Sequence, residues 1–382
     1  MFSVRNNKEG KHIAVIGIKG YPPKAGVDFV ADEIIRSSLN SGFKITVYGK
    51  RSCCNPDYKR ENLEIIPVWD MKGKHLSAFS YGLFSALHAL FFGDFGLIHL
   101  HCADYGYIVP LLRLRFRVLS TSHGAEYNRD KWNFLAKAFF RVVERPFIKY
   151  SNICTCVSRK LSEYYREKYR KKVLFVPNRI DFESMDRIKH LLDGRKCREY
   201  GLEPGRYILF CAGRIIPSKG CDILLKAGKS FETDVPVVII GNIKDRYYRK
   251  YLMQLKRDNT VFIDAIEDRR TLFDIIRHCR FFVFPSTYEA MSMMLLEAAA
   301  LGRGIVCSNI PENVDAIGEN ALFFNAGFIS DLAEKLKYAL ENPGEMDKLG
   351  KKGCDWVREN RNWEKFALTY IDLYRELMES ER

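Results

Sequence analysis

Residues 281–307 constrain the fold more than any other part of this 382-residue chain. The stretch opens with four apolar residues, Phe281 to Phe284, and a proline follows them. This pattern predicts a short strand that is buried on both faces. Residues 293–300 are apolar and rich in good helix formers, so they predict a buried helix, and a second apolar run begins at Ile305. Strand, helix and strand in this order predict a parallel α/β sheet.

Two carboxylates, Glu289 and Glu297, interrupt this apolar stretch. Eight residues of helix would separate them by about 12 Å, whereas the two carboxyl groups of a glycosidase lie about 5 to 9.5 Å apart. Ser286 and Thr287 are residues that favour a helix start. A helix start between the two carboxylates would offer backbone N–H groups to an anion. A nucleotide sugar has hydroxyls at both ends and phosphates between, and so fits such a site. A surface loop and a solvated helix position would produce the same spacing.

Composition indicates a globular chain of two domains, with 47% hydrophobic and 28% charged residues. The most apolar segment, residues 76–92, contains a histidine, serines and a glycine, so we interpret it as a buried helix rather than a membrane span. The first residues lack the apolar core of a signal peptide. The 11 cysteines show no metal-ligand spacing, which favours reduced thiols in a cytoplasmic protein.

Positive charge is concentrated in the first half of the chain. Residues 1–180 carry 30 Lys and Arg against 15 Asp and Glu, whereas the remaining residues carry 31 against 32. Residues 134–149 have helical amphipathic spacing with Lys137, Arg141 and Arg145 four residues apart. These features indicate an affinity for phosphates or an anionic membrane surface, and nucleic acid is a less favoured partner. A solvated helix face is the simpler alternative for residues 134–149.

The chain opens with a strand at residues 12–18, a helix from Val27 and another strand at 43–48, which predicts a Rossmann-like domain. Gly17 and Gly20 lack the third glycine of a dinucleotide-binding loop, so NAD binding is not expected. His99 and His101 alternate on one predicted strand. No third ligand lies near them in sequence, which favours structural histidines over a metal pair.

The central stretch resembles the nucleotide-sugar motif of the large family 4 of retaining glycosyltransferases. It departs from that motif at Ala290-Met291-Ser292, where the family has Gly-Phe-Gly, and at Gly304, where Pro is usual. The residues that match the family pattern are Pro285-Ser286, Glu289, Glu297-Ala298, Ala300, Gly302 and Val306.

Four further segments are similar to motifs of the same family. In one of them, Arg179 replaces the glycine of the family's P-N-G pattern, so a left-handed backbone conformation there would be strained or lost. The pattern that begins at His123 narrows the likeness to a bacterial subgroup with rhamnosyltransferases of surface polysaccharide assembly. The matching residues are Gly213, Arg214, Lys219, Gly220, Asp222 and Leu224 in the second half, Gly26 in the first loop, and His123, Gly124, Arg129, Lys131 and Trp132.

The resemblance implies a GT-B architecture, in which two Rossmann-like domains face each other across a cleft that holds the site. Residues 1–185 would form an acceptor-binding domain and residues 186–360 a nucleotide-sugar-binding domain. Residues 361–382 would form a helix that returns to the first domain.

The resemblance also implies roles for individual residues. Glu289 and His123 contact the donor sugar as the catalytic groups, and Glu297 binds the ribose hydroxyls. Arg214 and Lys219 grip the diphosphate, because two fixed cations stabilise the charge of the leaving nucleotide without a metal or a cofactor. Gly26, Ser292, Met293 and Ile266 complete the expected donor site.

We therefore expect a glycosyltransferase that moves a sugar from a nucleotide-diphospho-sugar to a glycan or lipid-linked acceptor, with retention of configuration. Surface polysaccharide or glycolipid synthesis is the expected setting, in the cytoplasm and peripherally at the inner face of the membrane. Two alternatives remain, a nucleotide-sugar epimerase and a non-catalytic anion- or membrane-binding protein of the same fold. The joint presence of Arg214, Lys219, Glu289 and Glu297 argues against the second.

Overall fold

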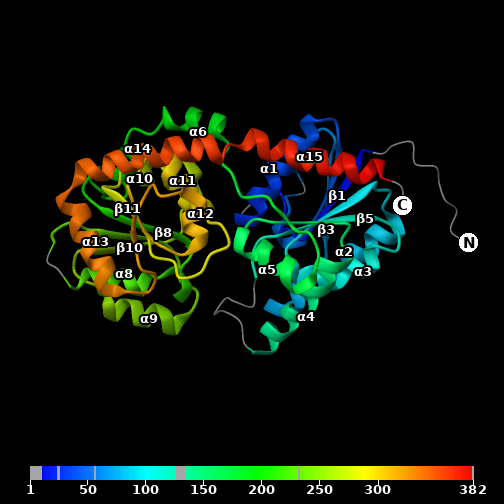
Figure 1. Cartoon of the computed structure of the whole chain (residues 1–382), viewed down its shortest axis with the longest axis horizontal. Coiled ribbons are helices and arrows are strands. Elements are labelled where there is room, and N and C mark those ends of the chain that lie inside the picture. The colour runs from blue at the N-terminus through cyan, green and yellow to red at the C-terminus, as the bar shows by residue number, and fades with distance from the viewer. Residues whose placement is uncertain (1–10, 24–25, 56, 126–133, 231–232, 381–382) are drawn as a thin grey trace, which may run out of the picture. The chain divides into compact units, whose positions relative to one another are not determined.

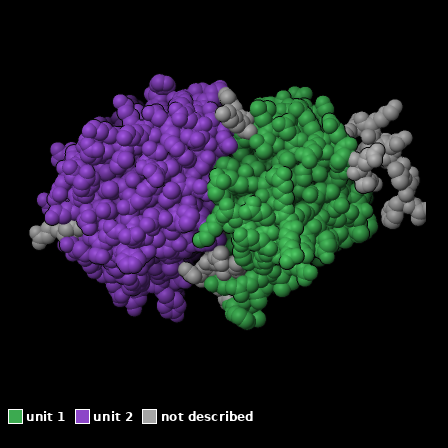
Figure 2. All heavy atoms as spheres, in the orientation of Figure 1, with its two compact units in different colours: residues 1–128, 132–177, 364–382 green, residues 129–131, 178–363 purple. Residues whose placement is uncertain are grey.

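The computed structural model describes residues 11–23, 26–55, 57–125, 134–230 and 233–380. The chain divides into two compact units, which are coloured separately in Figure 2. The first unit ends at Pro177 and also takes in the chain from Glu364 onwards, while the second spans Asn178–Trp363. The sequence analysis had set this boundary at residue 185.

The first unit is built on a seven-stranded parallel sheet. Its central strands are apolar, and in β1 the residues from Ile13 to Ile16 are at most 2% exposed because helices cover both faces. The strand order is β3-β2-β1-β4-β5-β6-β7. The strands are β1 (His12–Ile16), β2 (Lys44–Lys50), β3 (Leu63–Val68), β4 (Leu97–His101), β5 (Arg117–Ser122), β6 (Ile153–Cys156) and β7 (Leu174–Phe175).

Helices surround this sheet (Figure 1). The predicted burial of residues 76–92 holds for one face of α2 only, since Tyr81 is fully buried whereas Phe91 and Phe92 are 71% and 79% exposed. No helix in the described ranges is both long and apolar enough to cross a membrane. The helices are α1 (Gly26–Asn40), α2 (Lys74–Phe92), α3 (Val109–Leu112), α4 (Phe134–Tyr150), α5 (Arg159–Tyr169) and α15 (Trp363–Glu379), with 3-10 helices η1 (Arg51–Cys53) and η2 (Ala103–Ile108).

The last helix, α15, packs against the first unit, where it is drawn in red beside α1 and β1 (Figure 1). Its Tyr374 ring lies 5.9 Å from the ring of Phe43, and its Tyr370 hydroxyl lies within hydrogen-bond distance of Thr121 and Thr155 on β5 and β6. Buried aromatic side chains therefore fix the end of the chain to the first sheet.

The second unit contains a six-stranded parallel sheet of order β10-β9-β8-β11-β12-β13. Its strands are β8 (Ile208–Arg214), β9 (Val237–Asn242), β10 (Thr260–Ile263), β11 (Phe281–Phe284), β12 (Ile305–Ser308) and β13 (Leu322–Phe324). Its helices are α6 (Phe182–Lys189), α7 (Arg195–Glu199), α8 (Cys221–Gly228), α9 (Arg246–Leu255), α10 (Arg269–Arg277), α11 (Met293–Ala300), α12 (Pro311–Ile317), α13 (Ile329–Glu341) and α14 (Pro343–Asn360), with the 3-10 helix η4 (Pro217–Lys219).

The central stretch folds as strand β11, helix α11 and strand β12, which confirms the prediction from its sequence. The predicted helix start at Ser286 and Thr287 is wrong. The helix begins at Met293, and Ser292 caps it by accepting a hydrogen bond from the Leu295 N–H at 3.3 Å. Ser286 and Thr287 instead use their backbone atoms to join neighbouring loops.

Both sheets confirm the predicted Rossmann-like class. Counted within its own unit, the second sheet has strand order 3-2-1-4-5-6, and the first has the same order with a seventh strand at its end. The order reverses between β1 and β4 in the first unit and between β8 and β11 in the second. Ligands of such sheets bind outside the carboxyl ends of the strands at this reversal. Ligand-binding residues are therefore expected at the carboxyl ends of the strands beside these two reversals.

Candidate active site

An ion pair lies at the strand reversal of the second unit. Lys219, which follows β8, places its Nζ 2.5 Å from Oε1 of Glu289, which follows β11. The two side chains are 24% and 10% exposed, so the pair is partly shielded from water. The structure thus brings together two residues, 70 positions apart, that the sequence analysis assigned to the diphosphate and the donor sugar.

Gly220 allows these two loops to approach each other. Its φ is +70°, and a Cβ atom there would lie 2.1 Å from the carbonyl oxygen of Pro285. The Thr287 N–H also donates to the carbonyl oxygen of Ser218 at 2.9 Å. The glycine predicted from the family motif therefore has a steric reason, since any side chain would push Lys219 away from Glu289.

Arg214 ends β8 and is exposed, with no ion-pair or hydrogen-bond partner in the described ranges for its guanidinium. An unpaired guanidinium at the carboxyl end of a central strand is available to an anionic ligand. Within the second unit, the candidate phosphate-binding cations are therefore Arg214, which is exposed, and Lys219, which is paired with the Glu289 carboxylate.

Glu297 lies on α11 and is 3% exposed, yet it is an ion-pair partner of Arg269. The Nη2 of Arg269 donates to Oε1 of Glu297 at 2.7 Å, and this pairing was not foreseen from the sequence. Burial, with a smaller contribution from the nearby Glu297 carboxylate, raises the pKa of the Cys211 thiol on β8. The Glu297 carboxylate thus lies close to the carboxyl half of β8, the strand that ends in Arg214.

The remaining predicted donor residues of the second unit surround the start of α11 and the loop after β10. Ser292 is the helix cap and Met293 the first helical residue, and both are half-buried. Ile266 is half-buried in the loop between β10 and α10. A side chain missed by the sequence analysis, Asn178, donates from Nδ2 to the Met291 carbonyl oxygen at 3.1 Å and so ties the linker to this loop.

At the carboxyl edge of the first unit's sheet, the candidate site residues are histidines rather than ion pairs. His123 directly follows β5, and its Nε2 lies 3.0 Å from Nδ1 of His101 at the end of β4. The two rings are stacked, with centroids 5.3 Å apart and an interplanar angle of 18°. A hydrogen bond between two ring nitrogens needs one proton, so one ring donates and the other accepts. His101 therefore fixes the orientation of His123.

The neighbouring His99 is bound on both sides of its ring. Its Nδ1 lies 2.6 Å from the Tyr374 hydroxyl of α15, and its Nε2 lies 2.7 Å from Oγ1 of Thr121. Burial lowers the pKa of His99 to about 3, and burial together with the adjacent histidines lowers the pKa of His101 well below its usual value. Both rings are neutral at pH 7, as expected for structural histidines.

Gly26 begins α1 and is exposed, and a Cβ atom placed there would meet nothing within 4 Å. Asp28 in the first turn of α1 accepts a hydrogen bond from the Lys19 N–H at 3.0 Å, which anchors the loop after β1. Part of that loop, residues 24–25, lies outside the described residues. The same is true of Arg129, Lys131 and Trp132 in the extended pattern after His123.

Arg179 has a negative φ, so the left-handed conformation of a family glycine is absent at this position. Its guanidinium donates to the carbonyl oxygens of Asn360 and Asn362 at 3.4 and 3.2 Å. The substitution therefore links the start of the second unit to its end.

One group of metal-ligand types lies close together among the described residues, namely Cys197, Asp274 and His278. The Asp274 carboxylate accepts the N–H groups of Gly194 and Lys196 at 3.0 and 2.9 Å, and the Cys197 thiol lies 3.4 Å from the Tyr207 hydroxyl. These bonds give the group a structural explanation, since they fix α7 against α10.

Two family models match the chain, one in each half. The model described as Glycosyltransferase Family 4 matches residues 25–184, and the model described as Glycosyl transferases group 1 matches residues 195–356. The two matches correspond to the two sheets, and both of them describe glycosyltransferase domains.

Curated relatives show the same class. An alpha-maltose-1-phosphate synthase of Mycobacterium tuberculosis is 29% identical over 219 residues, which are 53% of this chain and 56% of that protein. The match thus spans little more than half the length of that relative. An uncharacterized glycosyltransferase of Methanocaldococcus jannaschii is 22% identical over 373 residues, which are 94% of this chain and 96% of the relative.

Solved structures share the fold. A sucrose-phosphate synthase from Thermosynechococcus elongatus has a TM-score of 0.78 at 17% identity and covers 96% of this chain and 99% of its own. An Anabaena protein in complex with UDP and glucose has a TM-score of 0.75 at 13% identity, with 96% and 100% covered. At these identities the likeness concerns the arrangement of strands and helices.

Proposed function

Since the chain belongs to the glycosyltransferases of GT-B type, we propose that it transfers a sugar from a nucleotide-diphospho-sugar to a glycan or lipid-linked acceptor. The observation that carries this proposal is the group of charged side chains at the reversal between β8 and β11. Lys219 is paired with Glu289, Arg214 is exposed at the end of β8, and Glu297 lies on α11.

In this proposal Arg214 and Lys219 bind the donor diphosphate. The bond between the anomeric carbon and the phosphate oxygen breaks, so negative charge develops on the diphosphate, and fixed cations stabilise that charge. Lys219 and Glu289 lie side by side, as required where a phosphate meets the sugar attached to it. We propose that these cations suffice without a metal ion or a cofactor.

Glu297 then accepts the ribose hydroxyls, and Ile266, Ser292 and Met293 line the nucleoside and sugar positions. A buried carboxylate on α11 and the N–H groups at the start of that helix can bind hydroxyls and phosphate in one ligand. The Anabaena neighbour that holds UDP and glucose supports a nucleotide-sugar donor for this fold in general.

The first unit supplies His123 and Gly26 to the sugar and the acceptor. His123 is positioned by His101, and Gly26 leaves room for a ligand because a side chain is absent there. As the oxygen of the acceptor hydroxyl bonds to the anomeric carbon, its proton passes to the departing diphosphate oxygen. We propose retention of configuration, as in the family that the motifs resemble, and a role in surface polysaccharide or glycolipid synthesis.

A thermal-shift panel of UDP-, GDP-, ADP- and dTDP-sugars tests the donor assignment. A ligand that binds only the native state raises the melting temperature, by an amount that corresponds to about 2.7 kcal/mol at 100 times its Kd. One nucleotide series should stabilise the wild type and should fail to stabilise Arg214→Ala and Glu297→Ala. If no sugar nucleotide shifts the wild type at millimolar concentration, the proposed donor site is wrong.

A second surface favours a membrane-bound acceptor. The outward face of α4 exposes Phe134, Leu135 and Val142 by 80%, 75% and 70%, together with the cations Arg141 and Lys149. Every exposed charged residue in the described part of residues 105–150 is basic, and Glu144 is buried. Apolar side chains beside cations are the chemistry that binds an anionic phospholipid surface.

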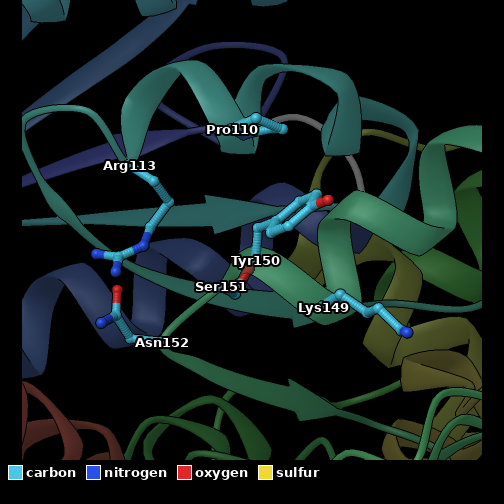
Figure 3. A pocket seen from close by; sticks show the side chains of 6 residues that line it. All are labelled: Pro110, Arg113, Lys149, Tyr150, Ser151 and Asn152. Carbon is cyan, nitrogen blue, oxygen red and sulfur yellow. The ribbon is translucent and has the colours of Figure 1, made fainter.

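A hollow of about 470 Å³ lies next to this face, between α3 and the end of α4. Figure 3 shows Arg113 pointing toward Asn152, while Lys149 extends away on the other side of Tyr150. A cation in an open hollow, with a second cation on the neighbouring surface, suits a phosphate headgroup. We propose that this face docks the protein on the inner, anionic leaflet, where a lipid-linked acceptor is found.

Vesicle flotation tests the docking face. Vesicles with phosphatidylglycerol should carry the wild type, and pure phosphatidylcholine vesicles or high salt should release it, because surface charges are screened within about 10 Å at 0.1 M salt. The double variant Val142→Glu/Lys149→Glu should stay in solution with its nucleotide affinity unchanged. Lys351→Glu on α14 changes one exposed cation elsewhere and should still float. Equal flotation of all variants would reject this face.

A further inference from the structure

The ion pair between Arg269 and Glu297 has a shape that points to a role in the donor site. Glu297 is 3% exposed and Arg269 is 39% exposed, so the pair runs from the interior of the second unit to its surface. Both residues adjoin segments of the proposed nucleoside position, since Arg269 opens the helix after the loop that contains Ile266. The pair is therefore placed to influence how a nucleoside meets Glu297.

The Arg269 guanidinium packs on an aromatic ring in addition to its ion pair with Glu297. Its Cζ lies 4.5 Å from the centre of the Phe273 ring, and that ring is 2% exposed. The first turn of α10 is fixed by Asp268, which accepts a hydrogen bond from the Thr271 N–H at 2.9 Å. A guanidinium stacked on a buried ring has little freedom, so it can impose an orientation on the carboxylate that it binds.

One oxygen of Glu297 is used by this contact and the other is not. Among the described residues, the bond from Arg269 to Oε1 is the carboxylate's single hydrogen-bonded contact. A buried carboxylate with no partner would be costly and free to change rotamer, whereas one held by a guanidinium keeps its direction. Oε2 is then presented to a ligand.

We propose that Arg269 is a positioning residue, which holds Glu297 so that its second oxygen accepts the ribose 2′-hydroxyl. Arg269 thereby sets the preference of the site for ribonucleotides over 2′-deoxyribonucleotides. The proposal rests on the proposed function, because it requires Glu297 to meet the ribose of the donor. To the proposed donor site it adds Arg269, which lies on a different helix from Glu297, and a preference between ribo- and deoxyribonucleotides that can be measured.

Calorimetric titration with UDP, ADP and GDP and with their 2′-deoxy forms tests this role. The wild type should prefer the ribo form of the nucleotide it binds by about 10-fold or more, as one hydrogen bond to a charged group predicts. Arg269→Met should reduce the preference below about 3-fold, while the affinity for the deoxy form changes little. Arg269→Lys, which keeps the charge, should recover part of the preference. An unchanged preference in Arg269→Met overturns the inference.

Arg270→Met is the matched control. Arg270 is the next residue of α10, is exposed, and donates to the Leu191 carbonyl oxygen at 3.2 Å rather than to a site residue. Its substitution should leave the preference as in the wild type. Because Arg269→Met leaves a buried carboxylate without its partner, the double variant Arg269→Met/Glu297→Gln removes that charge too and keeps the test independent of folding.

The variant Glu297→Gln distinguishes the donor-binding role of Glu297 from the positioning role of Arg269. If Arg269 acts only through Glu297, Glu297→Gln loses the preference and the double variant loses no more. If Glu297→Gln keeps both the affinity and the preference of the wild type, the assignment of Glu297 in the proposed function fails. If Glu297→Gln loses the preference and Arg269→Met keeps it, the positioning role alone fails. If the wild type binds none of the six nucleotides, both fail.

Discussion

The carboxyl edges of the two sheets carry different chemistry although their strands follow the same order. In the second unit the residues around the strand reversal are charged and paired, with Lys219 on Glu289 and Arg269 on Glu297. In the first unit they are imidazole rings, with His123 on His101 and His99 between Tyr374 and Thr121. The chemistry of the charged edge suits an anion, and that of the imidazole edge suits hydroxyls.

The difference shows how one topology is adapted twice. Cations at the second edge can meet phosphates directly, and they offset the cost of burying the carboxylates with which they pair. Imidazole rings at the first edge can donate and accept hydrogen bonds, as the hydroxyls of a sugar require. Variants of single residues can break or sharpen this contrast, and four are given below from the largest expected effect to the smallest.

Lys219→Ala should reduce kcat/KM by about 100- to 1000-fold, as expected when a charge-stabilising donor is removed from a transition state. Initial rates with the donor found in the thermal-shift panel measure this effect. Lys226→Ala on α8 is the matched control, because Lys226 pairs with Asp222 at 3.3 Å on the same helix segment and is 34% exposed. Comparable losses in the two variants would contradict a special role for Lys219.

Acid should destabilise the first unit before the second. An unfolded histidine takes up a proton below about pH 6.5, whereas folded His99 does so only near its lowered pKa of about 3. The free energy of unfolding therefore falls as the pH drops through this window, by about 1.4 kcal/mol per pH unit for each buried histidine. The second unit has no fully buried histidine among its described residues.

Hydrogen exchange of β4 and β11 between pH 7 and pH 5 measures this contrast, because the two strands report on different units. Protection of β4 should fall faster than protection of β11. His99→Asn should remove its share of the pH dependence, while His190→Asn at an exposed position should not. Parallel loss of protection in both strands would remove the proposed difference between the units.

Gly220→Ala should cost about 1–3 kcal/mol of stability and raise the donor KM. The added methyl group would lie 2.1 Å from the Pro285 carbonyl oxygen at a φ of +70°, so the loop must shift and carry Lys219 with it. Gly228→Ala is the control, since nothing lies within 4 Å of a Cβ there and its φ is not positive. A normal donor KM in Gly220→Ala would show that Lys219 reaches the phosphate by another route.

Tyr374→Phe should destabilise the protein by about 1–2 kcal/mol, because it leaves Nδ1 of the buried His99 without its partner. Urea denaturation gives this value. Tyr338→Phe removes a hydroxyl from a side chain that is 44% exposed on α13 and should have no effect. If the two variants are equally stable, the Tyr374 hydroxyl contributes nothing to holding α15 on the first sheet.

Local patterns predicted much of the second unit's site. Apolar runs and a proline placed β11, α11 and β12 correctly, and the likeness of Arg214, Lys219 and Gly220 to a family motif indicated the loop after β8 as a candidate site. The helix start was misplaced because Ser286, Thr287 and Ser292 are all suitable N-cap residues, and only Ser292 is followed directly by a helix. The helix α14 was not predicted, and the pairing of Arg269 with Glu297 had no sequence signal.

The sequence by itself determined which segments become strands, which loops carry cations and carboxylates, and that the chain forms two parallel α/β sheets. These properties depend on residues within a few positions of one another, so they can be read locally. Only the tertiary structure decided the partners of the site residues. His99 meets Tyr374 across 275 positions and Lys219 meets Glu289 across 70, because packing of strands and helices sets such distances.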